Sequence, residues 1–184
     1  MEIAFGQLEG CFAVLWLVSR AASWIKNGDF SWKREALLLL LFLDLAVVLR
    51  FTFFPRDLAD GHIPPLVLDL WKVFPLRINW VPFVRLTDYA FVRDLIWNVA
   101  GNVLMFVPTG ILLPVVYRDL DRFSLTVLAG FMISLCIEIL QIPFYARATD
   151  VDDLLANTLG AALGYGLLAL IRLGIRSRKA AAAQ

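Results

Sequence analysis

Six polar side chains interrupt two of the most apolar stretches of the sequence: Ser134, Glu138, Gln141, Asp150, Asp153 and Asn157. The first three have the spacing i, i+4, i+7 and the last three the spacing i, i+3, i+7, so each set shares one face of a helix. Carboxylates, amides and a hydroxyl in this arrangement could hold a polar ligand, transfer a proton or bind an oxygen-preferring cation. The elements that carry them must therefore bring two helical faces together.

Glu138 is flanked by Ile-Ser-Leu-Cys-Ile on one side and Ile-Leu on the other, so water cannot solvate it there. An ionised side chain at the centre of a membrane span costs about 2.5–3.5 kcal/mol, and such residues face the bundle interior and pair. We therefore predict that Arg50 pairs with Glu138. Arg147 could neutralise Asp150 or bind an anion bidentately.

The composition is that of an integral membrane protein. The chain has 184 residues, of which 60% are hydrophobic, and its mean hydropathy is +0.75. The net charge is only +1 and the basic residues are scattered, so the sequence shows no basic patch of the kind that binds nucleic acids. A single His62 in a loop, with Cys11 and Cys136 in apolar runs, has no metal-ligand spacing, so we predict no resident metal or cofactor.

The sequence predicts an all-α, polytopic membrane helix bundle of about five transmembrane helices, which we treat as one domain, residues 1–184. The long loop before the third span holds residues 66–74, a run too short to span, which we interpret as a short interfacial helix or re-entrant segment. Residues 175–184 form a tail. The predicted spans are Leu8 to Ile25, Ala36 to Phe54, Asp94 to Val116, Ser124 to Phe144 and Asp153 to Leu173.

Basic residues near the span ends predict an N-terminus outside and a cytoplasmic C-terminus. The second span then ends, the third begins, the fourth ends and the fifth begins on the same, outer side. Polar residues near these ends could form one outward-facing pocket centred on Glu138. Its substrate-binding candidates are Arg50, Asn98, Asn102, Ser134, Gln141, Arg147, Asp150 and Asn157, and its catalytic candidates are Glu138 and Asp153.

Structural interpretations compete with this one. Asn98 and Asn102 could serve only to hold neighbouring helices together by hydrogen bonds. For Asp152 we prefer a solvated position at a helix N-terminus. Gly160 and Gly164 form Gly-x-x-x-Gly, which indicates close helix packing, and Arg20 is assigned a structural role.

Four motifs in order carry a family resemblance: Asn79-x-x-Pro82-Phe83, Asn98-x-x-x-Asn102-x-x-x-Phe106-x-Pro108-x-Gly110, Ser134-x-x-x-Glu138-x-x-Gln141, and Arg147-x-x-Asp150-x-x-Asp153-x-x-x-Asn157-x-x-Gly160. Over residues 79–170 the chain resembles the VanZ-like family. The resemblance implies a multi-pass protein of the bacterial cytoplasmic membrane and a link to resistance to the glycopeptide teicoplanin. It does not indicate a reaction that the protein would catalyse.

Three hypotheses on function follow. The chain could bind, or bind and modify, a cell-envelope amphiphile such as a polyprenyl-linked wall precursor, a phospholipid or a lipoglycopeptide. It could instead be a carboxylate-based membrane hydrolase or transferase, assisted by Mg²⁺ or Ca²⁺. It could also be a structural or assembly partner of envelope enzymes. The sequence does not give an oligomeric state.

Overall fold

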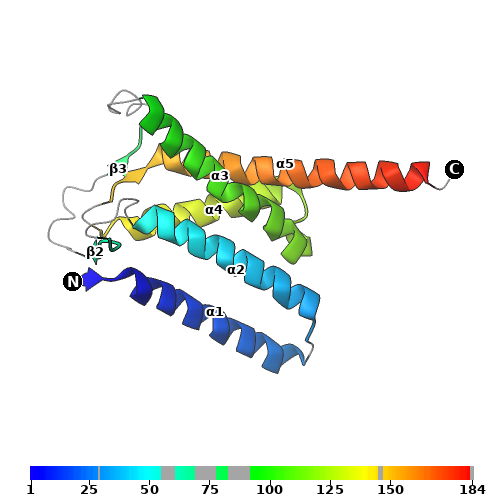
Figure 1. Ribbon diagram of the computed structural model, residues 1–184, viewed down its shortest axis with the longest axis horizontal. Coiled ribbons are helices and arrows are strands. Elements are labelled where there is room, and N and C mark those ends of the chain that lie inside the picture. The colour runs from blue at the N-terminus through cyan, green and yellow to red at the C-terminus, as the bar shows by residue number, and fades with distance from the viewer. Residues whose placement is uncertain (29, 55–60, 69–77, 83–91, 145–146, 183–184) are drawn as a thin grey trace. The chain divides into compact units, whose positions relative to one another are not determined.

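The computed structural model describes the chain except residues 29, 55–60, 69–77, 83–91, 145–146 and 183–184. Its described part has five α-helices and a 3-10 turn, η2 (Arg118–Leu120). All five helices are long and apolar enough to cross a membrane, which confirms the predicted fold class. The helices are α1 (Phe5–Asn27), α2 (Trp32–Phe53), α3 (Val92–Val116), α4 (Phe123–Gln141) and α5 (Val151–Ala181) (Figure 1).

Most helix ends differ from the predicted bounds by one to four residues and the end of α5 by more, and the differences at the ends of α4 and α5 have a cause in the sequence. α4 ends at Gln141 rather than at Phe144, because Pro143 disfavours a helical conformation at the residue before it and has no backbone N–H. α5 continues past the predicted Leu173 to Ala181, because this stretch has no proline and its Arg, Lys and Ala residues favour a helix, which outweighs the low propensity of Gly174.

The chain divides into two compact units. Unit 1 comprises Met1–Pro82 and Leu135–Val151, and unit 2 comprises Phe83–Ser134 and Asp152–Gln184. Unit 1 therefore holds α1, α2 and the end of α4, whereas unit 2 holds α3, the start of α4 and nearly all of α5. The single domain expected from the sequence stays a prediction.

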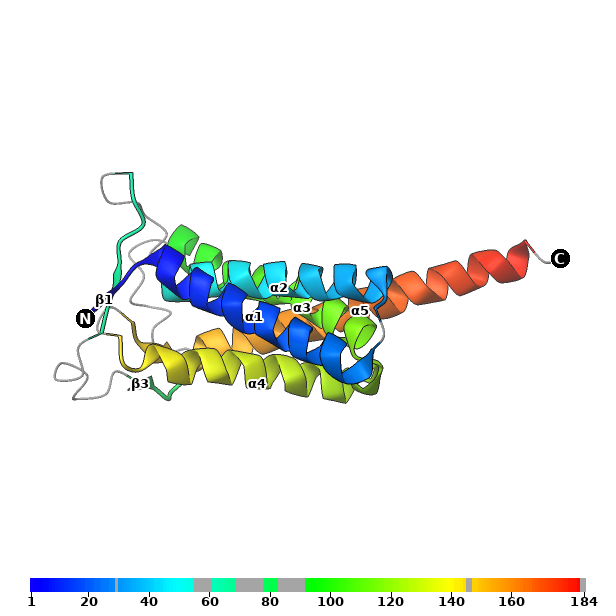
Figure 2. The same ribbon diagram turned by 90° about the horizontal axis from the view of Figure 1, so that it is seen from below.

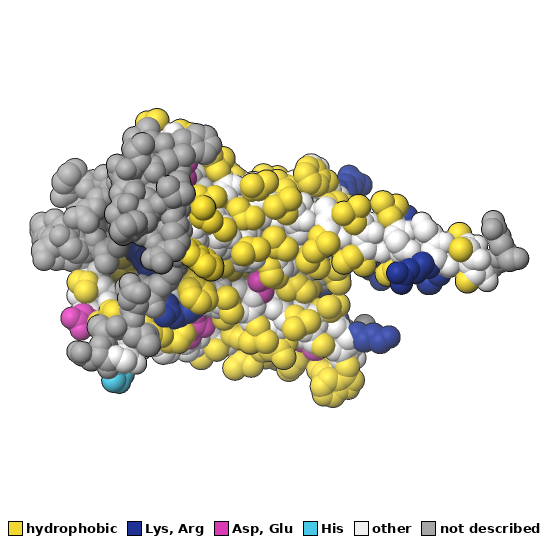
Figure 3. All heavy atoms as spheres, turned by 45° about the horizontal axis from the view of Figure 1, so that its top comes forward, with side chains coloured by type: hydrophobic (Ala, Val, Ile, Leu, Met, Phe, Trp, Pro, Cys, Tyr) yellow, Lys and Arg dark blue, Asp and Glu magenta, His cyan; other side chains and the backbone are white. Residues whose placement is uncertain are grey.

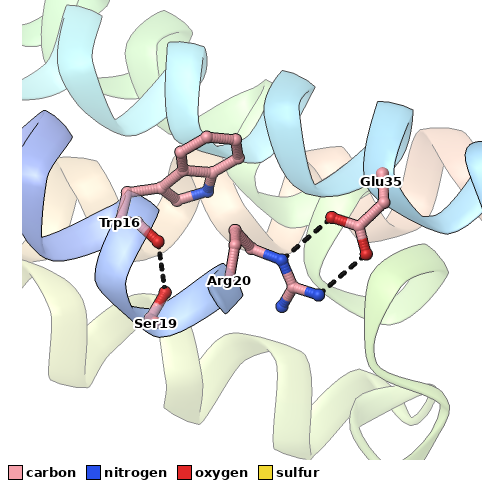
Figure 4. Close-up of polar contacts among 4 residues, drawn as sticks. All are labelled: Trp16, Ser19, Arg20 and Glu35. Carbon is pink, nitrogen blue, oxygen red and sulfur yellow. Dashed lines mark hydrogen bonds and ion pairs between the residues drawn. The ribbon is translucent and has the colours of Figure 1, made fainter. Parts of the chain in front are cut away.

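In unit 1, α1 and α2 pack through aromatic rings and one ion pair. Phe42 lies 5.0 Å from the ring centroids of both Phe12 and Trp16. Near the turn between the helices, Arg20 donates two hydrogen bonds, of 2.9 and 2.8 Å, to the Glu35 carboxylate (Figure 4). Both side chains are nearly buried, so the bidentate pair neutralises two charges inside apolar surroundings. This confirms the structural role assigned to Arg20.

Short strands tie the loops of unit 1 together. β1 (Glu2–Ile3) pairs antiparallel with β2 (Leu66–Val67), and β3 (Ile78–Asn79) pairs in parallel with β4 (Thr149–Asp150). The start of the predicted interfacial segment, residues 66–74, is therefore extended rather than helical. Its residues 69–74 lie outside the described part of the chain.

In unit 2, glycines bring the backbones of α3 and α5 into direct contact. A side chain on Gly110 of α3 would overlap the backbone of Ala161, and one on Gly160 or Gly164 of α5 would overlap the carbonyl of Val103 or Val107. This contact confirms the packing interpretation of Gly160 and Gly164. It also sets which residues of α3 face which residues of α5.

α5 is longer than the helices it packs against. Its 31 residues extend about 46 Å, against a hydrocarbon core of roughly 30 Å. Arg172 binds Asp121, which follows η2, at 2.7 Å, and α5 then runs beyond the end of α3 and the start of α4 (Figure 2). Hydrophobic side chains cover most of the visible helical surface, and basic side chains gather on the C-terminal part of α5 (Figure 3). This surface suits contact with lipid chains.

We expect Gly160→Ala to lower the free energy of unfolding by about 1–3 kcal/mol, because the new methyl group would overlap backbone and side-chain atoms of α3. Gly166→Ala on the same helix is the matched control, since a Cβ there meets nothing within 4 Å. Denaturant unfolding in detergent measures both. Equal stability of the two variants would contradict the close contact.

Candidate ligand-binding site

Most of the polar residues singled out by the sequence fall into two clusters, one in each unit. The Glu138 cluster, in unit 1, consists of Asn79, Glu138, Gln141, Arg147, Thr149 and Asp150. The Asn157 cluster, in unit 2, consists of Asn102, Ser134, Asp153 and Asn157. The two catalytic candidates, Glu138 and Asp153, thus belong to different clusters.

Glu138 joins the end of α4 to β4. Its side chain is 3% exposed, and its Oε2 accepts a hydrogen bond of 3.0 Å from the backbone N–H of Asp150. The Thr149 hydroxyl donates to the backbone carbonyl of Glu138 at 2.9 Å. Asp150 in turn accepts a bond of 3.1 Å from the amide of Asn79. The buried carboxylate therefore orders β4, the segment immediately before α5.

Gln141 and Arg147 satisfy carbonyl groups at the end of α2. Gln141 Nε2 donates to the Thr52 carbonyl at 2.6 Å, and Arg147 Nε donates to the Phe53 carbonyl at 2.8 Å. The last carbonyls of a helix have no partner within the helix, and in an apolar environment each unsatisfied one is costly. These two side chains thus have a structural role, and their contact with a ligand stays a prediction.

Arg50 lies one helical turn before the end of α2. It donates a bond of 3.4 Å to the Phe54 carbonyl, and its guanidinium lies 5.7 Å from the ring centroid of Phe5 and 5.4 Å from that of Phe51. These contacts suit a cation in apolar surroundings. The predicted pairing of Arg50 with Glu138 stays a prediction.

The Asn157 cluster joins α3, α4 and α5. Asn102 Nδ2 donates to Asp153 Oδ1 at 2.5 Å, and Asn157 Nδ2 donates to Ser134 Oγ at 2.9 Å. Asn102, Ser134 and Asn157 are buried, whereas Asp153 is partly exposed. Asn98 lies one turn before Asn102 on α3 and is also partly exposed. The polar groups therefore run from partly exposed positions to fully buried ones.

Asn157 has one polar atom for which the described part of the chain offers no hydrogen-bond partner. Its side chain is 1% exposed, and its Oδ1 has no hydrogen-bond partner in the described part of the chain. Buried polar atoms are nearly always paired, because an unpaired one costs about 1–3 kcal/mol. An exception of this kind points to a group that occupies the site in the working protein.

The contacts agree with the prediction that certain helix ends lie on the same side of the membrane. The end of α4 meets the end of α2 through Gln141 and Thr52 within unit 1. The start of α3 meets the start of α5 through Asn102 and Asp153 within unit 2. The single pocket that would combine both sets stays a prediction.

Sequence reasoning missed the acceptors at the end of α2 and the partner of Arg20. Thr52 and Phe53 act through backbone carbonyls, which every residue possesses, so their types carry no signal. Glu35 could have been predicted as the partner of Arg20, because a charged residue near the end of a span needs an opposite charge nearby. No group of three or more His, Cys, Asp or Glu residues suited to a metal ion occurs among the described residues, and divalent-cation binding stays a hypothesis.

Five candidate spans with buried polar clusters near their ends define a multi-pass membrane protein. The VanZ/LLP1 family model matches residues 36–172, so the chain belongs to this family. Protein VanZ of Enterococcus faecium is 29% identical over 116 residues, which cover 61% of this chain and 65% of that protein. No solved structure matches the chain.

We expect Gln141→Leu to lower the free energy of unfolding by about 1–3 kcal/mol, because the Thr52 carbonyl would lose its donor in an apolar environment. Leu140→Met, at the neighbouring exposed position, should change stability by less than about 0.5 kcal/mol. Denaturant unfolding of both purified variants checks this. A Gln141→Leu protein as stable as wild type would rule out the structural role.

Proposed function

We propose that this VanZ-family protein binds a cell-envelope amphiphile in the bacterial cytoplasmic membrane. The headgroup contacts the Asn157 cluster, and the acyl or prenyl chains lie against the exposed apolar surface of the helices. The observation that carries the proposal is the buried Asn157 Oδ1, which has no hydrogen-bond partner among the described residues.

The proposal rests on the energetic cost of the cluster. Two amides, a hydroxyl and a carboxylate occupy helices whose remaining surface is largely apolar. Helix association alone would account for the two hydrogen bonds within the cluster. It would not account for the Asn157 Oδ1 atom, a buried acceptor without a partner among the described residues. A bound ligand would account for both. A ligand that is polar at one end and apolar at the other matches both the cluster and the hydrophobic side chains around it.

The candidate ligands are a polyprenyl-linked wall precursor, a phospholipid and a lipoglycopeptide antibiotic. Membership of the family supports a role in resistance to the glycopeptide teicoplanin as part of the proposal. The match to the enterococcal relative spans less than two thirds of that protein, so its activity is not carried over whole. The basic residues at the span ends support binding from the outer leaflet.

A second candidate function is that of a structural partner in envelope assembly. It is favoured by the bonds from Gln141 and Arg147 to the end of α2, since these residues stabilise the protein whether or not a ligand binds. The two functions differ in one measurable respect. A purely structural role predicts that ligand retention and stability fall together in every variant of the polar residues.

To test binding, wild type, Asp153→Ala and the control Asp152→Ala are purified in mild detergent, and their co-purified lipids are compared by mass spectrometry. We expect a specific lipid in wild type that falls at least about 5-fold in Asp153→Ala, because Asn102 loses its partner in the cluster. Asp152→Ala should retain it.

Thermal unfolding of the same samples separates binding from folding. The same bulk lipids in all three preparations would contradict the proposal, as would equal losses of the lipid in the Asp152 and Asp153 variants. A loss that tracks the melting temperature of each variant would favour the structural function instead.

A further inference from the structure

The hydrogen bonds of the Asn157 cluster determine which kind of group it can still bind. Both amide groups already donate within the cluster: Asn102 to Asp153, and Asn157 to Ser134. The atom with no partner among the described residues is the Asn157 carbonyl oxygen Oδ1, which can only accept a hydrogen bond. The open position therefore needs a donor.

This excludes the bare phosphate of an amphiphile from contact with the Asn157 Oδ1 atom. A phosphodiester carries only acceptor oxygens, and placing one beside a buried carbonyl oxygen would bring two acceptors together. An ammonium group would need a negative charge to offset its desolvation, and in this cluster that charge lies on Asp153 rather than on Asn157. A neutral hydroxyl donor suits the position best.

The place of Asn157 in the cluster supports this assignment. Asp153 lies one helical turn before Asn157 on α5 and is partly exposed, whereas Asn157 is fully buried. One turn corresponds to about 6 Å along the helix axis. A headgroup that enters past Asp153 would thus extend a hydroxyl about one turn deeper to reach Asn157 Oδ1.

We propose that Asn157 selects amphiphiles whose headgroup carries a hydroxyl, as glycerol and sugar headgroups do, by accepting a hydrogen bond at Oδ1. This inference rests on the proposed function and adds the ligand's chemical class. Glycerol phospholipids and sugar-linked polyprenyl lipids share the required donor, and phosphatidylglycerol serves as the probe.

The experiment compares two matched pairs of lipids with identical acyl chains, bound to delipidated full-length protein and measured by native mass spectrometry. Phosphatidylglycerol and phosphatidylmethanol are both anionic phosphodiesters, but only the first has hydroxyl donors. Phosphatidylethanolamine and phosphatidylcholine are both zwitterionic, but only the first has N–H donors. Each pair keeps charge constant and changes the donor.

We expect wild type to prefer phosphatidylglycerol over phosphatidylmethanol by about 2- to 10-fold, the range expected for one neutral hydrogen bond. Asn157→Leu, which keeps a side chain branched at Cγ and removes the acceptor, should abolish this preference. Thr158→Val is the control: it removes a hydroxyl at the next position, which donates to the Leu154 carbonyl, and the preference should remain.

The wild-type result is decisive even if Asn157→Leu does not fold. Equal binding of phosphatidylglycerol and phosphatidylmethanol would overturn the hydroxyl assignment while leaving amphiphile binding intact. A preference only for phosphatidylethanolamine over phosphatidylcholine would also overturn it, in favour of an ammonium ligand. Binding of none of the four would contradict the proposed function itself.

A preference for phosphatidylglycerol that survives in Asn157→Leu would overturn the role of Asn157, because another residue would then select the donor.

Discussion

Because Gly110, Gly160 and Gly164 have no side chains, the backbones of α3 and α5 can lie against each other in unit 2. In a membrane, where lipid and protein interiors are equally apolar, such close van der Waals contact is a main source of helix association. The contact fixes the rotation of both helices, and so it brings Asn102 against Asp153 and turns Asn157 inward. Larger residues at these glycines would separate the polar groups that the cluster needs.

A second constraint explains the polar residues of unit 1. The carbonyls at the end of α2 cannot rely on water in an apolar environment, and they receive donors from Gln141 and Arg147 instead. Glu138 likewise accepts the Asp150 N–H and orders β4, the segment immediately before α5. The same residue types therefore do different work in the two units: in unit 1 they satisfy backbone groups, and in unit 2 they leave an acceptor open.

The sequence predicts the five spans well, because length and hydropathy are properties of each segment alone. It also predicts which polar residues share a face, because that follows from the helical period. It does not predict that Gln141 and Arg147 bind backbone carbonyls, since no residue type identifies an acceptor of that kind. Nor does it show which atom of Asn157 lacks a partner, since this depends on the position of Ser134 in the fold.

The central claim is that Asn157 Oδ1 accepts a hydrogen bond from a bound lipid. Isotope-edited infrared spectroscopy tests it directly, with asparagine labelled by ¹³C at the side-chain carbonyl and spectra recorded before and after phosphatidylglycerol is added to delipidated protein. We expect one side-chain carbonyl band to move to lower frequency on lipid addition, and this change to be absent in Asn157→Leu. Lipid that binds while every labelled carbonyl band stays unchanged would contradict the claim.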